Sequence, residues 1–216
     1  MWVFGHRTKV GFNVFEPYRG GESGYLLCQL LRVYKQLFNI SYFEVEPFQF
    51  GADNEDAIAS GAFWFYYRFG FRPVDKEICK QAELEQQKIK SRKNYRSSAK
   101  TLVGFTGGNI ALNLGNSIPA DVIQISTQVL SSIKKDWKNN YQQARKQAVE
   151  RFCKLVQLNI NSLSAMEIKI MEDLALWAMA MQVTNKQKLQ LMKQMVFTST
   201  TDIYAYQDLL RKFFKK

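Results

Sequence analysis

The sequence predicts an α+β fold that is followed by an all-helical region. Residues 9–73 read as strand, glycine turn, helix, strand and helix. From Pro119 to the end of the sequence, apolar residues keep the spacing of helices instead. The hydrophobic fraction of 46% is sufficient for a packed core in both parts. We therefore expect a mixed sheet with flanking helices in residues 1–115 and a helical domain in residues 116–216.

The first strand is expected over Lys9–Tyr18. Apolar side chains fall on both of its faces, as in an interior strand that is covered on two sides. The turn that follows, Arg19–Gly24 (RGGESG), precedes a helix. Glycines between a strand and a helix expose backbone N–H groups at the helix N-terminus, where a phosphate or another anion can bind. A purely structural turn is the alternative, because any positive-φ bend selects glycine.

The first helix is expected over Tyr25–Phe38, where leucines at helical spacing make a broad apolar face that includes Leu26 and Leu37. Asn39 is placed to end this helix. A second strand follows over Ser41–Phe48. Its side chains alternate between the two faces, with Phe43 and Val45 on one face and Glu44 and Glu46 on the other.

A second helix is expected near Asn54–Phe69, with Asp53 or Asn54 as its N-cap. Residues 63–67 are consecutive aromatics, which cannot all face one side of a helix, so some of them must meet a second surface. Beyond Pro73 the pattern predicts a charged helix over Val74–Asn94, a short helix within Arg96–Phe105 and a strand at Ile110–Leu114 that adds to the sheet.

The helical region is expected to hold about five helices. A capping box at Ser164–Glu167 precedes an apolar helix over Ile168–Met181. Two further helices are expected over Thr184–Phe197 and Asp202–Phe214. Methionines gather in this region, either as core filler or as the lining of an adaptable docking groove.

Residues 9–73 resemble the second half of the GCN5-related N-acetyltransferase family, a fold that binds acyl-CoA. The order of strands and helices is one point of resemblance. The family's pyrophosphate loop is another: it has Arg or Gln, two residues, Gly, one residue, then Gly or Ala. Arg19 and Gly24 match its ends, whereas Glu22 stands in place of the central glycine. The resemblance implies that the loop holds the pyrophosphate of acetyl-CoA or another acyl-CoA through Arg19, Gly20, Gly21, Glu22, Ser23 and Gly24.

A tyrosine is the third point of resemblance. The family often has a tyrosine four residues before a Gly-Phe pair, as Tyr66 stands before Gly70 and Phe71. The resemblance implies that Tyr66 protonates the leaving thiolate of CoA. It also implies that a carboxylate on a central strand, Glu44 or Glu46, is the general base for the incoming amine. The alternative is that both carboxylates face solvent or pair with Arg or Lys.

The family fold has further strands and helices before the glycine-turn strand, whereas only eight residues precede Lys9 here. A central strand without its neighbour would expose an edge that pairs readily with other chains. Three interpretations stay open. The chain is a fragment of a longer polypeptide, a partner chain completes the sheet, or the resemblance misleads.

The net charge of +11 is unevenly distributed along the chain. Residues 1–75 carry 7 Lys and Arg against 8 Asp and Glu, a net of −1, and residues 76–216 carry 23 against 11, a net of +12. A basic domain attracts nucleic acid or another anionic surface at long range. The alternative is a set of solvated helix faces, because the lysines are spread among Gln and Asn along the predicted helices.

Several classes of protein are disfavoured. Three cysteines lie far apart with no Cys-x-x-Cys pair, which argues against a disulfide framework and a zinc site. Cys28 lies among leucines, so we expect its thiol to be buried. No run approaches the ~20 apolar residues of a membrane helix, and no secretory signal pattern is present, so we expect a cytoplasmic protein without membrane contacts. With His6 as the single histidine and no P-loop, hydrolase and metal chemistry are also disfavoured.

Three functions from different classes remain. The chain binds acyl-CoA and transfers an acyl group to an amine, it keeps the same fold as an inactive structural or partner-binding module, or its basic helical region binds nucleic acid. Glu22 and the short N-terminal part favour the second function. Whether the chain is an active enzyme is left open by the sequence.

Overall fold

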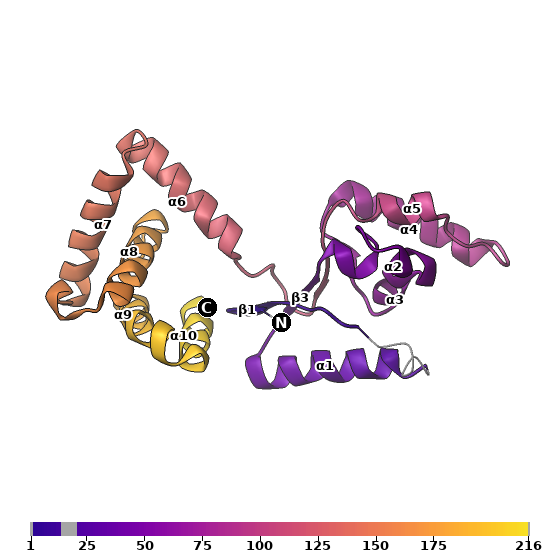
Figure 1. The fold of residues 1–216 in the computed structure, drawn as a ribbon, viewed down its shortest axis with the longest axis horizontal. Coiled ribbons are helices and arrows are strands. Elements are labelled where there is room, and N and C mark those ends of the chain that lie inside the picture. The colour runs from indigo at the N-terminus through magenta and orange to yellow at the C-terminus, as the bar shows by residue number, and fades with distance from the viewer. Residues whose placement is uncertain (1, 14–20, 216) are drawn as a thin grey trace. The chain divides into compact units, whose positions relative to one another are not determined.

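The chain folds as two compact units, Met1–Pro119 (the N-terminal unit) and Ala120–Lys216 (the helical unit). The computed structural model describes residues 2–13 and 21–215. The N-terminal unit combines a sheet with helices, and the helical unit has helices only (Figure 1). The predicted α+β class with C-terminal helices is therefore confirmed, and the boundary lies four residues after the predicted one.

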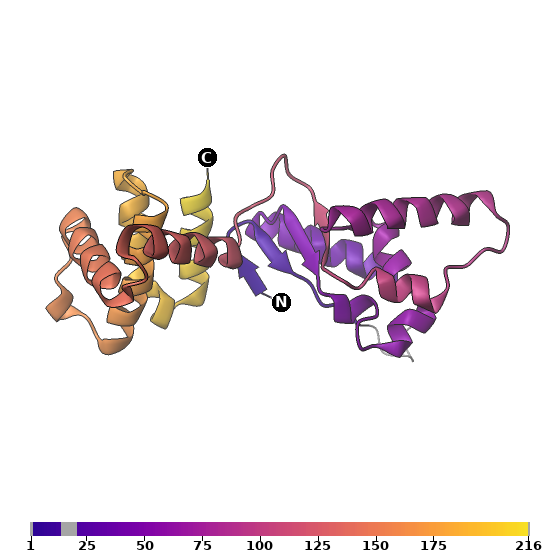
Figure 2. The same ribbon diagram turned by 90° about the horizontal axis from the view of Figure 1, so that it is seen from above.

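The described part of the N-terminal unit holds one five-stranded sheet in the order β1-β2-β3-β5-β4. Figure 2 shows the arrows of this sheet with helices beside them. Strands β2 and β3 are parallel and are joined through helix α1, whereas the other neighbouring pairs are antiparallel, so the sheet is mixed. The strands are β1 (Trp2–Phe4), β2 (Arg7–Lys9), β3 (Tyr42–Val45), β4 (Arg72–Pro73) and β5 (Ile110–Asn113). The predicted strand at Ile110–Leu114 does join the sheet, between β3 and β4.

The strand predicted over Lys9–Tyr18 begins too late in the sequence. A hairpin precedes it: β1 and β2 pair across a turn at Gly5, which has a left-handed φ of 58°. The ladder with β3 ends at Val10, whose N–H donates to the carbonyl of Glu44 at 2.7 Å. Beyond it, Gly11–Asn13 form no strand. The rest of the predicted strand lies outside the described residues.

Helix α1 runs over Ser23–Phe38 and ends at Asn39, which takes the left-handed C-cap conformation that the sequence predicts. The predicted helix over residues 54–69 is instead two helices, because Gly61 breaks it with a φ of 68°. Asn54 caps the first of these, accepting a hydrogen bond from the N–H of Ala57. The helices after α1 are α2 (Glu55–Ser60), α3 (Ala62–Arg68), α4 (Lys76–Ser91) and α5 (Ala99–Gly104), with a 3-10 turn, η2, at Pro47–Phe50.

The core of the N-terminal unit is strongly aromatic. Phe63 on α3 is fully buried, and its ring centroid lies 4.5 Å from that of Phe105 and 5.9 Å from that of Phe50. Ring pairs at these distances add to the stabilisation from burial. The break at Gly61 sets the direction of α3, and Phe63, Tyr66 and Tyr67 are its buried residues. The aromatic run therefore divides between the core and its rim, as its sequence requires.

The apolar face of α1 is narrower than its sequence suggests. Leu27 and Leu31 are buried, but Leu26 and Leu37, expected in that face, are exposed. Cys28 is exposed as well, so the prediction of a buried thiol is wrong. A leucine-rich helix needs only some of its leucines for the face that packs against the core. Its composition does not show which of the leucines remain exposed.

The helical unit consists of five helices among its described residues. The capping box at Ser164 and Glu167 is present in full. Met171, Met192 and Met195 are completely buried, so these methionines serve as core filler. None of the described helices has the length and apolar character to cross a membrane. The helices are α6 (Val122–Trp137), α7 (Tyr141–Val156), α8 (Ala165–Ala180), α9 (Lys186–Thr201) and α10 (Ile203–Phe214), with a 3-10 turn, η3, at Ile160–Ser162.

Candidate functional site

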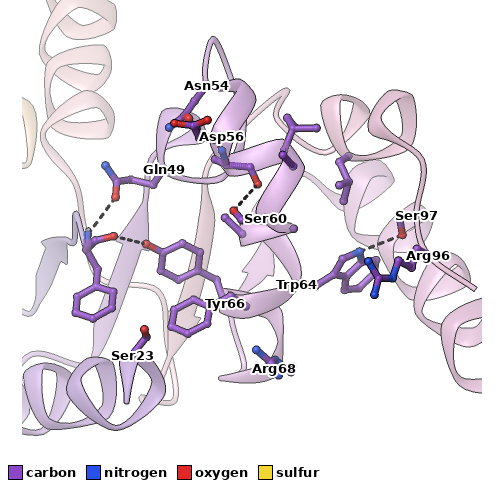
Figure 3. Close-up of a pocket in the computed structure, with 18 of the residues that line it drawn as sticks. Ser23, Gln49, Asn54, Asp56, Ser60, Trp64, Tyr66, Arg68, Arg96 and Ser97 are labelled. Atoms are coloured by element: carbon purple, nitrogen blue, oxygen red, sulfur yellow. Dashed lines mark hydrogen bonds between the residues drawn. The ribbon is translucent and has the colours of Figure 1, made fainter. Parts of the chain in front are cut away.

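In the N-terminal unit, the chain stops pairing with β3 shortly after the end of β2. Past Val10 the chain leaves the ladder, and side chains take over the hydrogen bonds of Phe12. The amide oxygen of Gln49 accepts from the N–H of Phe12 at 3.1 Å, and the hydroxyl of Tyr66 donates to the carbonyl of Phe12 at 3.4 Å. Figure 3 draws both bonds. Side chains from η2 and α3 therefore hold the chain at Phe12, after β2 has ended at Lys9 and next to the point where β3 ends at Val45.

A cavity of about 780 Å³ opens beside this segment. Phe12, Ser23 and Tyr66 line one end of it, and Arg96 and Ser97 line the other (Figure 3). Pockets that take small molecules have volumes of roughly 300–1,000 Å³. The cavity is therefore large enough for an extended cofactor arm together with part of a second substrate.

The N-terminus of α1 meets the same end of the cavity. The first N–H groups of a helix have no partner within the helix, and here these belong to Ser23, Gly24 and Tyr25. Glu22 stands at the N-cap but makes no side-chain hydrogen bond to them, and no acidic residue occupies the first turn. Gly21 has a left-handed φ of 90°. The dipole of this 16-residue helix therefore presents donors for an anion.

The predicted phosphate loop is only partly visible. Gly21 and Glu22 are exposed, and a Cβ added to Gly21 would have no atom within 4 Å, so this part of the turn is open to solvent. A Cβ on Gly24 would lie 2.7 Å from the ring of Phe69, so this glycine allows α1 to approach the end of α3. Arg19 and Gly20 lie outside the described residues.

Tyr66 is well placed for proton transfer. It is 2% exposed, and burial raises its pKa to about 12 although the hydrogen bond to the carbonyl of Phe12 acts in the opposite direction. The phenol therefore keeps its proton at neutral pH. Its hydrogen bond to Phe12 is long at 3.4 Å, so a better acceptor in the cavity can compete for the proton.

The two carboxylates expected to act as general base lie away from the cavity. Phe43 and Val45 pack in the same core cluster as Tyr66, so Glu44, which alternates with them on β3, points to the opposite face of the sheet. Glu46 is exposed and pairs with the ammonium of a lysine on β2 at 2.6 Å. Neither carboxylate lines the cavity.

Glu44 is a structural residue in this arrangement. Its Oε2 accepts hydrogen bonds from two guanidinium nitrogens of Arg7 at 3.1 and 2.8 Å, and its Oε1 accepts from the amide of Asn109 at 3.0 Å. The side chains of Arg7 and Glu44 are 9% and 5% exposed. These three hydrogen bonds take most of the lone-pair positions of a carboxylate that is almost fully buried, so little of it is accessible to a substrate. The role of general base does not fit it.

Sequence reasoning did not single out several residues of the cavity. Gln49 holds the backbone of Phe12, and Arg68 and Arg96 bring positive charge to the lining. Asp56, on the first turn of α2, is the one carboxylate among the described lining residues. Its position at a helix N-terminus reads in the sequence as a helix-start signal, which conceals any other role.

Neither the described side chains, examined for a metal site, nor comparisons with known proteins identify the chemistry of the cavity. Within residues 2–13 and 21–215, no group of three or more His, Cys, Asp or Glu side chains could hold a metal ion. Comparisons with protein-family models, with curated proteins and with solved structures found no match to the chain.

Proposed function

We propose that the N-terminal unit binds an acyl-coenzyme A and transfers its acyl group to an amine. The observation that carries the proposal is the segment at Phe12, which follows β2 and is held by Gln49 and Tyr66 beside the cavity. A segment that leaves a parallel strand pair next to a helix N-terminus offers a surface for a pantetheine arm and donors for its diphosphate. The order of elements in residues 9–73 supports the same reading.

The diphosphate is assigned to the turn before α1. The N–H groups of Ser23 and Gly24 supply donors that no side-chain cap competes for. Glu22 is exposed, so its carboxylate can swing into solvent rather than block these donors. From the turn before α1, the pantetheine arm runs along Phe12 toward Tyr66. The acyl group enters the cavity between Phe12 and Tyr66.

Transfer is assigned to one direct displacement. The neutral amine nitrogen attacks the thioester carbon, the C–N bond forms, and the C–S bond breaks as the thiolate leaves. The hydroxyl of Tyr66, which burial keeps protonated at neutral pH, donates a hydrogen bond and then its proton to the leaving thiolate. Because a phenol with a pKa of about 12 is a weaker acid than a thiol, this transfer is uphill and is completed when solvent reprotonates Tyr66. The attacking nitrogen releases one proton to solvent, and solvent returns one to Tyr66, so the products are an amide and free CoA thiol.

A second function, an inactive partner-binding module, is favoured by three observations. Glu22 places a carboxylate at the proposed phosphate corner, and neither of the expected bases, Glu44 and Glu46, lines the cavity with Tyr66. Helix α1 also exposes an apolar stripe of Leu26, Val33 and Leu37, at 44%, 44% and 66%. Exposed apolar side chains at helical spacing are suited to contact with another protein.

Titration calorimetry with CoA, acetyl-CoA and pantetheine distinguishes the two functions. We expect saturable binding of CoA and acetyl-CoA with a Kd between about 1 μM and 1 mM. Pantetheine lacks the diphosphate, so it should bind far more weakly. Absence of heat and of a thermal shift with CoA at millimolar concentration would leave the inactive module as the better description.

A further inference from the structure

A strongly basic segment connects α4 to α5. Residues 88–100 (KIKSRKNYRSSAK) contain six Lys and Arg and no Asp or Glu. All six cationic side chains are exposed. The segment is in the N-terminal unit, whereas the sequence directed attention to the helical region as the nucleic-acid-binding part. The six cations are Lys88, Lys90, Arg92, Lys93, Arg96 and Lys100.

Buried polar contacts hold this basic segment in place. The carboxylate of Glu85, a residue only 3% exposed, accepts the hydroxyl of Tyr95 at 2.8 Å and the ammonium of Lys88 at 3.0 Å. The indole N–H of Trp64 donates to the hydroxyl of Ser97 at 3.0 Å. Burial on its own raises the pKa of Glu85, but hydrogen bonds from Lys88, Tyr95 and Ser97 outweigh it and the pKa is lowered. The carboxylate therefore stays ionised and keeps the loop anchored at neutral pH.

Most of the positive charge of the segment is not neutralised. Glu85 offsets the charge of Lys88, and the guanidinium of Arg92 lies 5.8 Å from the ring centroid of Tyr95. The other four cations have no carboxylate within ion-pair distance among residues 2–13 and 21–215. Lys90 lies on α4, Lys100 lies on α5, and Lys93 and Arg96 lie on the anchored connection between these helices. Cations held in this way lose less conformational freedom on binding than cations on a disordered tail.

The side chains of the segment suit a sugar-phosphate backbone better than a lipid surface. Lys, Arg, Ser, Asn and Tyr are the residues that contact phosphate oxygens in nucleic-acid complexes. Binding in the plane of a membrane requires large exposed apolar side chains, and the two large apolar residues of the segment, Ile89 and Tyr95, are half-buried. The helical unit is also basic, with 15 Lys and Arg against 8 Asp and Glu, but no 13-residue stretch of it holds six Lys and Arg.

We propose that residues 88–100 bind the phosphate backbone of nucleic acid without sequence preference. This activity does not depend on the acyl transfer proposed above, although Arg96 and Ser97 of the segment also line the cavity. Neutralising about four to six phosphates gives a plot of log K against log salt with a slope of about −4 to −5 on duplex DNA. Affinity should therefore fall steeply between about 50 and 200 mM salt.

Fluorescence anisotropy of a labelled duplex of mixed sequence tests the proposal on the full chain. The triple variant K90Q/K93Q/K100Q removes three exposed charges that have no ion-pair partner. We expect it to weaken binding at least about tenfold at low salt and to make the slope shallower by about 2 to 3. The matched control, K134Q/K135Q/K146Q, removes the same charge from the exposed surface of the helical unit.

The comparison with the control variant decides whether the loss of affinity is specific to residues 88–100. An equal loss of affinity in both triple variants would mean attraction by net charge alone and would overturn the assignment to this segment. So would an absence of binding by the unmodified chain at about 50 mM salt, or binding to phosphatidylserine vesicles but not to DNA. Hydrogen exchange on the unmodified chain gives a second readout that needs no variant. Added duplex should slow exchange in residues 88–100, and unchanged exchange there would also count against the proposal.

Discussion

The buried pair of Arg7 and Glu44 allows a direct test of whether Glu44 is structural or catalytic. Replacement by alanine removes the carboxylate that accepts from two guanidinium nitrogens of Arg7, at a site where the two side chains are 9% and 5% exposed. Breaking a buried ion pair costs about 3–5 kcal/mol. Because the guanidinium also lies 4.8 Å from the ring centroid of Tyr42, we expect the lower end, about 3 kcal/mol. E44Q, which keeps a hydrogen-bonding oxygen, should cost about 1–2 kcal/mol.

Native-state hydrogen exchange measures this loss within the N-terminal unit, whereas a single unfolding curve would mix two units. The N–H of Val10, bonded to the carbonyl of Glu44 at 2.7 Å, is the reporter. A loss of 3 kcal/mol lowers its protection by about two orders of magnitude. The control E46A breaks the exposed pair with Lys9 and should cost about 0–1 kcal/mol. The double variant R7M/E44M should recover most of the protection.

Two outcomes would refute this reasoning. One is equal protection in E44A and E46A, which would mean that the buried pair contributes no more than the exposed one. The other is an E44Q variant with full protection and no acyl transfer, which would return Glu44 to the role of general base.

Three further predictions concern the proposed site. Y66F should slow acyl transfer by about 10²–10⁴-fold with an unchanged Kd for CoA; an unchanged rate, or a loss of binding that accounts for the loss of rate, would remove Tyr66 as the acid. Because burial raises the pKa of Tyr66 to about 12 and a tyrosine in the unfolded chain titrates near 10, stability should fall as pH rises from about 10 to 12, at up to about 1.4 kcal/mol per pH unit. Denaturant titrations across that range, followed by a probe in the N-terminal unit, should show a smaller fall in Y66F, and identical profiles would contradict the burial of Tyr66. E22Q should tighten CoA about 2–5-fold by removing a like charge near the diphosphate, whereas E55Q, an equally exposed substitution at the start of α2, should leave the Kd unchanged; no difference between the two variants would place the diphosphate elsewhere.

Local signals in the sequence were sufficient for several elements. Asn39 ends α1 in the left-handed conformation, Asn54 caps α2, and Ser164 with Glu167 forms the capping box before α8. Each of these depends on groups within a few residues of one another, so spacing and residue type are enough to predict them.

Long-range pairing was not accessible in the same way. The hairpin of β1 and β2 consists of two three-residue strands, too short for an alternating pattern to appear. As a result, the predicted strand began at Lys9, where the observed one ends. The break at Gly61 was also missed, because a glycine within a helical pattern is often tolerated and only packing decides whether the helix continues.

The candidate site shows the same division. Tyr66 was identified from its spacing to a Gly-Phe pair, and the structure brings it to the cavity. Glu44 was selected for lying on a central strand, but its partners Arg7 and Asn109 are 37 and 65 residues away in sequence. Gln49 likewise reaches Phe12 across 37 residues. No spacing rule reveals contacts of that kind. The buried ion pair and the contact of Gln49 with Phe12 could therefore be seen only in the folded structure.

The most direct test of the proposed acyl-CoA site is the response of backbone amide resonances to CoA. If the diphosphate binds at the start of α1, the N–H signals of Ser23, Gly24 and Tyr25 should shift most on titration, together with that of Phe12 beside the cavity. Shifts confined to residues 88–100, or no shifts at the start of α1 at saturating CoA, would contradict the account.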